Sequence, residues 1–385
     1  MDFDLTPEQD ELRAAVRLFA EGVVAPAAAE ADEREEFPTE IVKRAAELGL
    51  FGIPFPEELG GQGGDLLSFC LCLEEIGRYD SSLAITLEAA VGLAGIPIFR
   101  FGTDEQRERW LVPMARGEAI GAFALTEPGG GSDARAIRTT ARLDGGEWVI
   151  EGSKAFITNS GTPLTSVILV AARDEDADDG DVSTIVVPVG TPGLSVGPSY
   201  RKVGWRASDT HEVSFDGCRV PADHLLGERG RGYAQFLETL ADGRVAIAAL
   251  SVGLARGCLE ESVRYASERE AFGRPIGAFE ALQFKMADMQ VGVETARLAY
   301  QRAAWLCDRG RPFATEASIA KLYASEVAVS SAREAVQIHG GYGFVEDFPV
   351  ARFYRDAKVL EIGEGTSEIQ RVLIARALGL PGTDL

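Results

Sequence analysis

The order of the periodicities along the chain constrains its fold most. Residues 1–118 place apolar side chains at helical spacing, beginning with a capping-box sequence at Thr6–Gln9. Residues 119–227 instead contain short β-branched runs bounded by Gly, Asp and Pro, and residues 228–385 return to long Ala-rich helical stretches. The sequence therefore predicts an α+β multidomain protein. It would have an N-terminal α-helical domain, a middle β-barrel-like domain and a C-terminal four-helix bundle, divided at these bounds.

The elements follow from the same patterns. Helices are predicted from Thr6 to just before Pro26, and over Thr39–Leu48, Leu66–Tyr79, Leu83–Phe101, Asp104–Arg116, Tyr233–Arg269, Phe279–Arg309, Ala314–Gln337 and Ser367–Leu378. Strands are predicted over Trp148–Ile150, Ser166–Val170, Ser183–Val189, Leu194–Val196 and Glu212–Phe215.

Charge excludes several classes of partner. The 38 Lys and Arg against 60 Asp and Glu give a net charge of −22, which opposes binding to nucleic acid or to an anionic membrane.

The longest apolar run that we identify, Val245–Ala255, is too short to cross a bilayer. The N-terminus Met-Asp-Phe-Asp-Leu shows no basic segment typical of a signal peptide. Five cysteines without a CxxC pair and three scattered histidines favour neither disulfides nor a metal. We expect a cytoplasmic protein.

Three short segments could carry chemistry. A glycine run in Ala124–Asp133 would let backbone N–H groups approach a ligand, a second lies in Gln337–Phe344, and Glu364 stands between two glycines in Glu361–Gln370. A carboxylate on such a turn, beside apolar helices, could serve as a general base once burial raises its pKa. Each segment alone also has an ordinary structural explanation: a turn, a helix C-cap and a surface loop.

Taken together, the three segments resemble the acyl-CoA dehydrogenase family over nearly the whole chain. ALTEPGGGSDARA at Ala124–Ala136 is similar to the first family motif, and QIHGGYGFVEDFPVARFYRD at Gln337–Asp356 is similar to the second. The sequence GEGT, which contains Glu364, follows shortly afterwards. The resemblance implies FAD as cofactor, an acyl-CoA as substrate and a role in fatty acid β-oxidation.

The resemblance also implies roles for individual residues. Glu364 would be the catalytic base that removes the α-proton. Ser132, Arg244 and Gly365 would contact the substrate. The flavin would be contacted within one subunit by Phe123, Leu125, Thr126, Ser132, Phe156 and Thr158, and near the base by Thr366 and Glu368. Four residues would reach the FAD of a neighbouring subunit: Arg269, Phe272, Gln337 and Gly341.

Three positions depart from the family pattern. In some branches the base lies on the first bundle helix, but Gly243 occupies that position here, beside the carboxylate of Asp242. Gly363 replaces a common tyrosine, which could leave room for a branched, cyclic or bulky acyl group. Glu280 stands where a glutamine often contacts FAD, and we leave it out of the site because a carboxylate near a pyrophosphate is unfavourable.

By resemblance, a trans-2-enoyl-CoA would form as the β-hydrogen leaves as hydride to flavin N5. The thioester carbonyl would accept a hydrogen bond from the N–H of Glu364. Electrons would pass to an electron-transferring flavoprotein, and the protein would be a homotetramer built as a dimer of dimers.

Other functions remain open at this point. A flavin-dependent oxidase or monooxygenase of the same fold is the nearest alternative, although many such relatives lack the GEGT glutamate. Decarboxylation of a glutaryl-type substrate would need a cation, and Ser81–Ile98 contains no Lys or Arg. A DNA-binding relative would need a basic surface or tail, whereas this chain ends in Gly-Leu-Pro-Gly-Thr-Asp-Leu. A helical scaffold with a decayed site is disfavoured by the intact motifs.

Overall fold

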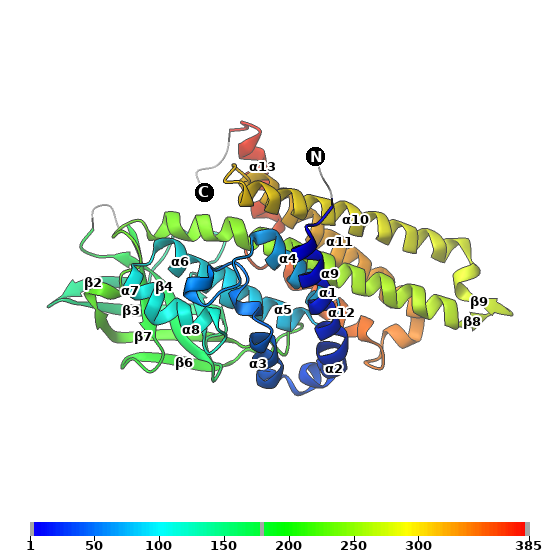
Figure 1. Cartoon of the computed structure of the whole chain (residues 1–385), viewed down its shortest axis with the longest axis horizontal. Coiled ribbons are helices and arrows are strands. Elements are labelled where there is room, and N and C mark those ends of the chain that lie inside the picture. The colour runs from blue at the N-terminus through cyan, green and yellow to red at the C-terminus, as the bar shows by residue number, and fades with distance from the viewer. Residues whose placement is uncertain (1–3, 178–180, 382–385) are drawn as a thin grey trace.

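A block of helices, a sheet and a second block of helices follow one another along the chain in the predicted order (Figure 1). The computed structural model describes residues 4–177 and 181–381. Residues 1–3, on which the expectation of no signal peptide partly rests, and residues 382–385 of the tail lie outside that part. Helix gives way to strand between Ala115 and Ile120, and strand to helix between Pro221 and Gly232. We propose these two transitions as the domain boundaries.

The N-terminal block is helical, as predicted. Its elements are α1 (Pro7–Phe19), η1 (Ala20–Val24), α2 (Ala25–Arg34), α3 (Thr39–Glu47), η2 (Leu50–Gly52), η3 (Glu57–Leu59), α4 (Leu66–Gly77), α5 (Ser81–Glu88), η4 (Ala89–Gly95), α6 (Ile96–Phe101), α7 (Asp104–Gln106), η5 (Arg107–Leu111) and α8 (Val112–Ala115). The capping box at Thr6 is present, with the Thr6 hydroxyl accepting from the Gln9 N–H and the Gln9 side chain accepting from the Thr6 N–H.

Pro26 does not end the first helix, contrary to the prediction, and two further prolines lie inside helices that were predicted to continue through them. The first helix passes Pro26 and continues to Arg34, through the π-helical segment η1. The π-helical segments η4 and η5 likewise precede Pro97 and Pro113, each of which is the second residue of the next helix. A proline has no N–H and clashes with the carbonyl four residues earlier. The wider π turn shifts the hydrogen bonding by one residue, so the helix can accommodate the ring.

One helical stretch among the described residues, Ser81–Phe101, is long and apolar enough by composition to cross a membrane, and 94% of its most apolar window is buried inside the protein. It consists of α5, η4 and α6, with η4 packed against β1 and α9. A core helix of a folded domain meets the same criteria of length and composition, and this helix occupies that position (Figure 1).

The middle segment forms one seven-stranded mixed sheet. Its strands are β1 (Ile120–Ala124), β2 (Thr140–Asp144), β3 (Glu147–Thr158), β4 (Thr165–Asp174), β5 (Val182–Pro188), β6 (Leu194–Ser199) and β7 (Thr210–Pro221). β4 pairs with β5 along one edge, and with β1 and then β2, in parallel, along the other. β3 and β7 pair antiparallel beyond β2. The sequence missed β1 and β2, because Ile120-Gly-Ala-Phe-Ala124 lacks a β-branched run and Thr140–Asp144 lacks clear alternation.

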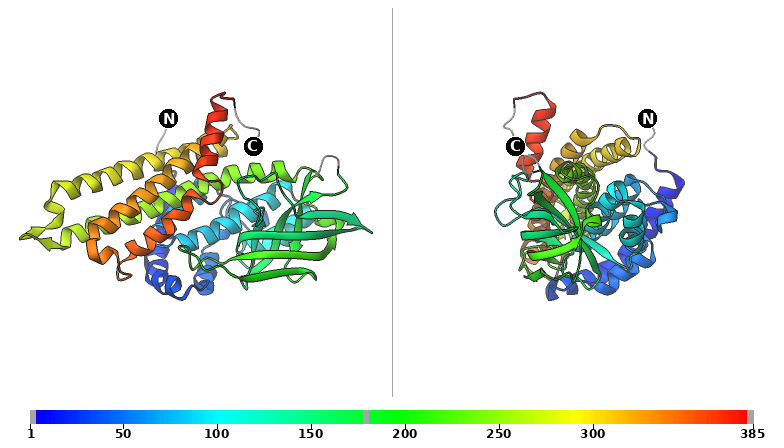
Figure 2. Two further views of the ribbon diagram at one scale, coloured as in Figure 1. Left: turned by 180° about the vertical axis from the view of Figure 1, so that it is seen from behind. Right: turned by 90° about the vertical axis from the view of Figure 1, so that its left-hand side faces the viewer.

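The C-terminal block contains three long helices, which match their predicted spans to within a few residues. Its elements are η7 (Ala222–His224), α9 (Gly232–Glu268), β8 (Glu270–Ala271), β9 (Arg274–Pro275), η8 (Ile276–Ala278), α10 (Glu280–Asp308), α11 (Ala314–His339), η9 (Gly340–Gly343), α12 (Pro349–Ala357), η10 (Lys358–Glu361) and α13 (Ser367–Ala377). α9 is central, since it packs against α10, α11 and α4 (Figure 2). The short α12 was not predicted.

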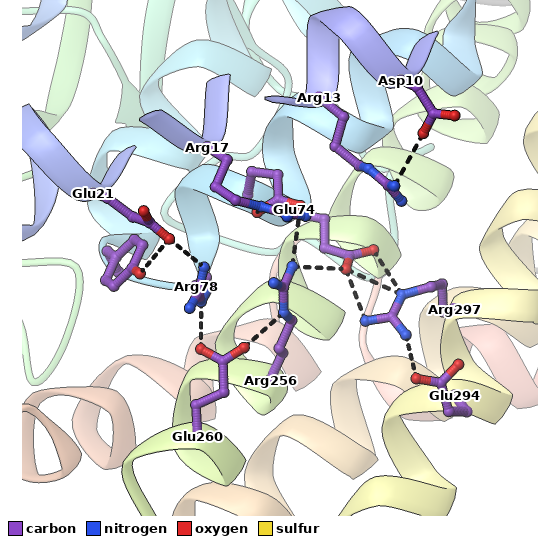
Figure 3. A network of polar contacts seen from close by, with 12 residues as sticks. Asp10, Arg13, Arg17, Glu21, Glu74, Arg78, Arg256, Glu260, Glu294 and Arg297 are labelled. Atoms are coloured by element: carbon purple, nitrogen blue, oxygen red, sulfur yellow. Dashed lines mark hydrogen bonds and ion pairs between the residues drawn. The ribbon is translucent and has the colours of Figure 1, made fainter. Parts of the chain in front are cut away.

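A buried ionic network joins the two helical blocks (Figure 3). Glu74 of α4 is 4% exposed and accepts from Arg297 of α10 at 2.9 Å and from the Tyr300 hydroxyl at 2.6 Å. Its neighbour Glu75 accepts from Arg256 of α9 at 3.1 Å and from Arg17 of α1 at 2.8 Å. Buried charges are tolerated only when they are paired and hydrogen-bonded, so this network fixes how α1 and α4 pack on the bundle.

A second buried carboxylate connects all three segments of the chain. Asp356 of α12 accepts from the Trp205 N–H, between β6 and β7, at 2.7 Å and from the Ser81 hydroxyl, at the start of α5, at 2.9 Å. Burial raises the pKa of Asp356 to about 6, although both hydrogen bonds favour the ionised form. Asp356, the last residue of the second sequence motif, therefore joins the three segments in this chain.

We expect Asp356→Ala to destabilise the protein by about 2–4 kcal/mol, because it leaves the Trp205 N–H and the Ser81 hydroxyl buried without an acceptor. Denaturant unfolding should show a lower midpoint at unchanged slope. Asp216→Ala, at an exposed position in β7, is the control and should change the free energy of unfolding by less than about 0.5 kcal/mol. Equal midpoints for the two variants would contradict the role given to Asp356.

Candidate active site

Glu364 lies on a strained turn between η10 and α13. Its φ is +53°, and that of Gly365 is +96°, so two consecutive residues adopt left-handed backbone conformations. This conformation is uncommon for a residue with a side chain, and such strain gathers at functional sites. Two hydrogen bonds stabilise the turn. Lys321 of α11 donates to the Gly365 carbonyl oxygen at 2.7 Å, and the Gln370 amide donates to the same oxygen at 3.0 Å.

The carboxyl group of Glu364 points into the protein. Both of its oxygens are buried and have no hydrogen-bond partner among the described residues, although Glu364 as a whole is half-buried. Its Oε2 lies against Gly243 of α9, where an added Cβ would come within 2.2 Å of that oxygen. The alternative base position named from the sequence therefore meets Glu364 in space, and the glycine there leaves room for the carboxyl.

Two buried cations face this carboxyl. Arg244 of α9 is 7% exposed, and its Nε has no hydrogen-bond partner among the described residues. Lys321 is fully buried, and burial lowers its pKa to about 8. Burial raises the pKa of Glu364, while the charges of Lys321 and Arg244 act in the opposite direction. The result is a desolvated carboxyl that can still ionise, which is what a general base requires.

A second carboxyl, which the sequence reading missed, lies beside the first. Glu88, the last residue of α5, is fully buried, and neither of its oxygens has a hydrogen-bond partner among the described residues. Burial and the neighbouring Glu364 carboxyl both raise the pKa of Glu88 well above its usual value. The available signal was an acidic residue inside the apolar stretch Ser81–Ile98.

The two segments predicted to contact a flavin within one subunit lie side by side. The Ala155 N–H of β3 donates to the Thr126 carbonyl oxygen at 2.9 Å. The buried Lys154 ammonium donates to the Leu125 carbonyl oxygen at 3.1 Å and to the Glu127 carboxylate at 2.8 Å. Leu125, Thr126 and Thr158 are half-buried, and Ser132 is exposed. Lys154 and Glu127, which the sequence did not single out, therefore hold the first motif against β3.

Aromatic rings mark this part of the sheet. Phe156 has a φ of +60° and is 65% exposed, with its ring 5.1 Å from that of Tyr200. The ring of Phe123 instead packs on Phe236 of α9 at 4.3 Å, so it joins the sheet to the bundle. At the end of β3, Asn159 donates to the Thr86 carbonyl oxygen at 2.9 Å, which ties this segment to the helix that carries Glu88.

The residues predicted to reach a neighbouring subunit lie elsewhere. Arg269 and Phe272 belong to the β8–β9 hairpin, which lies at the opposite end of the molecule from the sheet (Figures 1 and 2). Arg269 lies over the ring of Tyr342, at 5.9 Å, so the hairpin meets the turn that follows α11. Phe272 is 94% exposed, and Gln337 and Gly341 are exposed as well. The contact of Arg269 with Tyr342 places the hairpin beside the turn that contains Gly341, at the end of the bundle away from the sheet (Figure 1).

The two remaining predicted residues follow the base. The Thr366 hydroxyl caps α13 by accepting from the Ile369 N–H at 3.3 Å, and Glu368 is exposed in the first turn of that helix. A capping hydroxyl and an acid in the first turn both stabilise a helix N-terminus. Both residues thus have a structural role in addition to the predicted contact with the cofactor.

Comparison with known protein families shows which family the chain belongs to. Three family models match in order: the acyl-CoA dehydrogenase N-terminal domain over residues 6–118, the middle domain over 122–218 and the C-terminal domain over 230–379. The chain belongs to the acyl-CoA dehydrogenase family. The predicted family and fold are therefore confirmed.

Individual relatives of this acyl-CoA dehydrogenase family member are similar over their whole length. The probable acyl-CoA dehydrogenase YngJ of Bacillus subtilis is 48% identical, over 98% of this chain and 100% of its own. The short-chain specific acyl-CoA dehydrogenase of Clostridium acetobutylicum is 44% identical, over 97% of this chain and 99% of its own.

Solved structures agree with this assignment. Butyryl-CoA dehydrogenase from Megasphaera elsdenii is 40% identical, with a TM-score of 0.95 over 99% of this chain and 100% of its own. A chain of the structure reported as electron transferring flavoprotein of Acidaminococcus fermentans is 42% identical, with a TM-score of 0.96 over 98% and 99%. Acyl-CoA dehydrogenase complexed with FAD from Bacillus anthracis is 34% identical, with a TM-score of 0.91 over 97% of this chain and 67% of its own.

The contact between Gly243 and Glu364 leads to a test. Gly243→Ala should lower acyl-CoA dehydrogenase activity about 100-fold, because the new methyl group displaces the Glu364 carboxyl and an error of about 1 Å in a reacting group has this effect. Helix stability should not fall, since alanine favours a helix more than glycine does. Gly22→Ala, where an added Cβ meets no atom within 4 Å, is the matched control. Equal activity in both variants would show that the carboxyl does not need this position.

Proposed function

We propose that this chain is an FAD-dependent acyl-CoA dehydrogenase in which Glu364 removes the α-proton of an acyl-CoA thioester. The observation that carries the proposal is the Glu364 carboxyl. It is buried on a left-handed turn, has no hydrogen-bond partner within residues 4–177 and 181–381, and faces two cations. A surface loop residue would have neither the strain nor the burial. Arg244, Gly365 and Ser132 are proposed to contact the acyl-CoA.

The residues of the first motif and of β3 suit a flavin. An isoalloxazine is planar and aromatic with polar edges, and the chain offers the exposed ring of Phe156 beside the hydroxyls of Thr126 and Thr158. Phe123, Leu125 and Ser132 complete this proposed set, and Thr366 and Glu368 lie beside the base. FAD, when bound, supplies the acceptor for the hydride that leaves Cβ.

The protein's own contribution is a proton acceptor and a place for negative charge. The ionised Glu364 takes the α-proton, while the electron pair of the C–H bond stays on the substrate. Charge that develops on the thioester oxygen would be stabilised by the Glu364 N–H, by about 2.7–4 kcal/mol if it acts like an oxyanion-hole donor. Burial of the carboxyl keeps water from competing for that proton.

The names of similar proteins suggest which substrate and which electron acceptor to test first. Two similar proteins are named short-chain specific acyl-CoA dehydrogenase and butyryl-CoA dehydrogenase, so a short acyl-CoA is the first substrate to test. Gly363, in place of a common tyrosine, makes branched and cyclic acyl groups the next. An electron-transferring flavoprotein remains the proposed electron acceptor, supported by the similar chain of the Acidaminococcus fermentans structure.

The position of the hairpin supports a site shared between subunits. The β8–β9 hairpin, beside Arg269 and Phe272, lies at the opposite end of the molecule from β3, which carries Phe156 and Thr158, and this separation supports a site to which two subunits contribute (Figures 1 and 2). A second copy that places its hairpin over the first copy's sheet would complete the site. We therefore propose a homotetramer arranged as a dimer of dimers.

Glu364→Gln tests the base. The amide keeps the size of the side chain but cannot accept a proton, so flavin reduction by acyl-CoA should slow by about 10²–10⁴-fold. Stopped-flow bleaching of the bound flavin measures this rate, and the FAD content of the variant should match that of the wild type. Undiminished bleaching in the variant would rule out Glu364 as the base.

Phe272→Ala tests the shared site. The side chain is 94% exposed in one chain, so its loss should not unfold that chain. The FAD-to-protein ratio should nevertheless fall when the variant is diluted, as judged from absorbance and sedimentation. Leu18→Ala, also at an exposed apolar position, is the control. An active monomer that retains FAD would contradict the proposal.

A further inference from the structure

Two buried carboxyls and two buried cations meet at one point of the interior. Glu88 comes from α5, Glu364 from the turn before α13, Arg244 from α9 and Lys321 from α11. The proposed function uses Glu364 and gives no task to Glu88. A fully buried carboxyl with no hydrogen-bond partner for either oxygen is costly, and its presence requires an explanation.

The backbone around the two carboxyls leaves space for both. An added Cβ at Gly92 would come within 2.6 Å of the Glu88 Oε1, and one at Gly243 within 2.2 Å of the Glu364 Oε2. Leu93 lies 3.3 Å from the same Gly243 position, so η4 and α9 enclose the pair together. The carboxyls thus lie in adjoining spaces, each of which depends on a glycine.

We propose that Glu88 and Glu364 share a single proton at neutral pH, that the proton resides on Glu88, and that Glu88 is a positioning residue that keeps Glu364 ionised. The inference rests on the proposed function of Glu364 as the base. A proton on Glu88 also provides a donor between two carboxyls whose four oxygens are buried and have no hydrogen-bond partner in the described part of the chain.

Electrostatics require the shared proton. Two ionised carboxylates in contact, out of water, repel one another strongly, so one of a close pair stays protonated. The pKa of each carboxyl is raised by burial, and the two carboxyls act directly on one another. Full ionisation of both would therefore be reached only well above the usual range for glutamate.

The positions of Lys321 and Arg244 determine which of the two carboxyls is protonated. Glu364 faces Lys321 and Arg244, and both favour its ionised form. Among the described residues, the charged group that acts on Glu88 is Glu364, which favours the neutral form. Farther out, Glu361 and Glu368 act on Lys321 and help to keep it charged. The proton thus remains on Glu88, and Glu364 is left free to accept the α-proton.

Infrared spectroscopy of the FAD-loaded protein tests where the proton is. Spectra are recorded at pH 8, where Asp308 and Asp356, with pKa values raised to about 6, are ionised. The spectrum of Glu88→Gln, which contains the same flavin and the same other carboxyls, is subtracted from each of the other two spectra. The carbonyl band of a protonated buried carboxyl should then remain for the wild type and for Glu364→Gln. No difference band for the wild type, or a difference band that is lost in Glu364→Gln, overturns the proposal.

The pH profile of flavin reduction tests the effect on the base. Glu88→Gln retains a neutral donor beside Glu364, so the acid limb of its profile should stay within half a pH unit of the wild type. Glu88→Leu removes the donor, so the pKa of Glu364 rises. At one pH unit below the midpoint of the wild-type acid limb, flavin reduction in Glu88→Leu should be about tenfold slower than in the wild type. At high pH the two rates should become equal. Glu88→Leu with an unmoved limb overturns the proposal.

Asp308→Asn is the matched control. Asp308 ends α10, its carboxylate accepts from the Leu66 N–H, and its pKa is also raised, so its replacement should leave the acid limb unchanged. Failure of the proposed function is distinguishable. If Glu364→Gln still bleached the flavin at the wild-type rate, Glu364 would not be the base, whereas the infrared result would still report where the proton lies.

Discussion

The contact between Glu364 and Gly243 is the constraint on which the site depends. It lets a carboxyl from the turn before α13 enter the space between α5 and α9, where both of its oxygens are out of water. Every neighbouring feature follows from that burial. The left-handed turn directs the side chain inward, Lys321 and Gln370 hold the turn, and Arg244 and Lys321 balance the charge. Without the glycine, there would be no room for the carboxyl.

The rest of the fold keeps this space in place. The site draws on helices from both helical blocks, so the blocks must not slide past one another. The Glu74 network fixes α4 against α9 and α10 (Figure 3). Asp356 ties α12 to the start of α5 and to the loop after β6. Buried ion pairs add little net stability but enforce one arrangement, because a shifted helix would leave charges unpaired.

Much of the fold could be predicted from local patterns. Apolar spacing located the long helices, and β-branched runs located five of the seven strands of the sheet. The errors have local causes. β1 and β2 lack strand-like composition, and Pro26 does not end its helix because a π turn accommodates it. The two motifs also predicted the family, and the comparisons confirm it.

The candidate site was predicted only in part. Glu364 was identified from its flanking glycines and its motif, whereas Glu88 and Lys321 were missed. The amino-acid sequence by itself determined the order of helical and β segments, the glycines and the two motifs, because these depend on residues close together in the chain. Only the tertiary structure decided that Glu88, Arg244, Lys321 and Glu364 meet, because they come from four separate elements and their charges matter only once packing has removed the water between them.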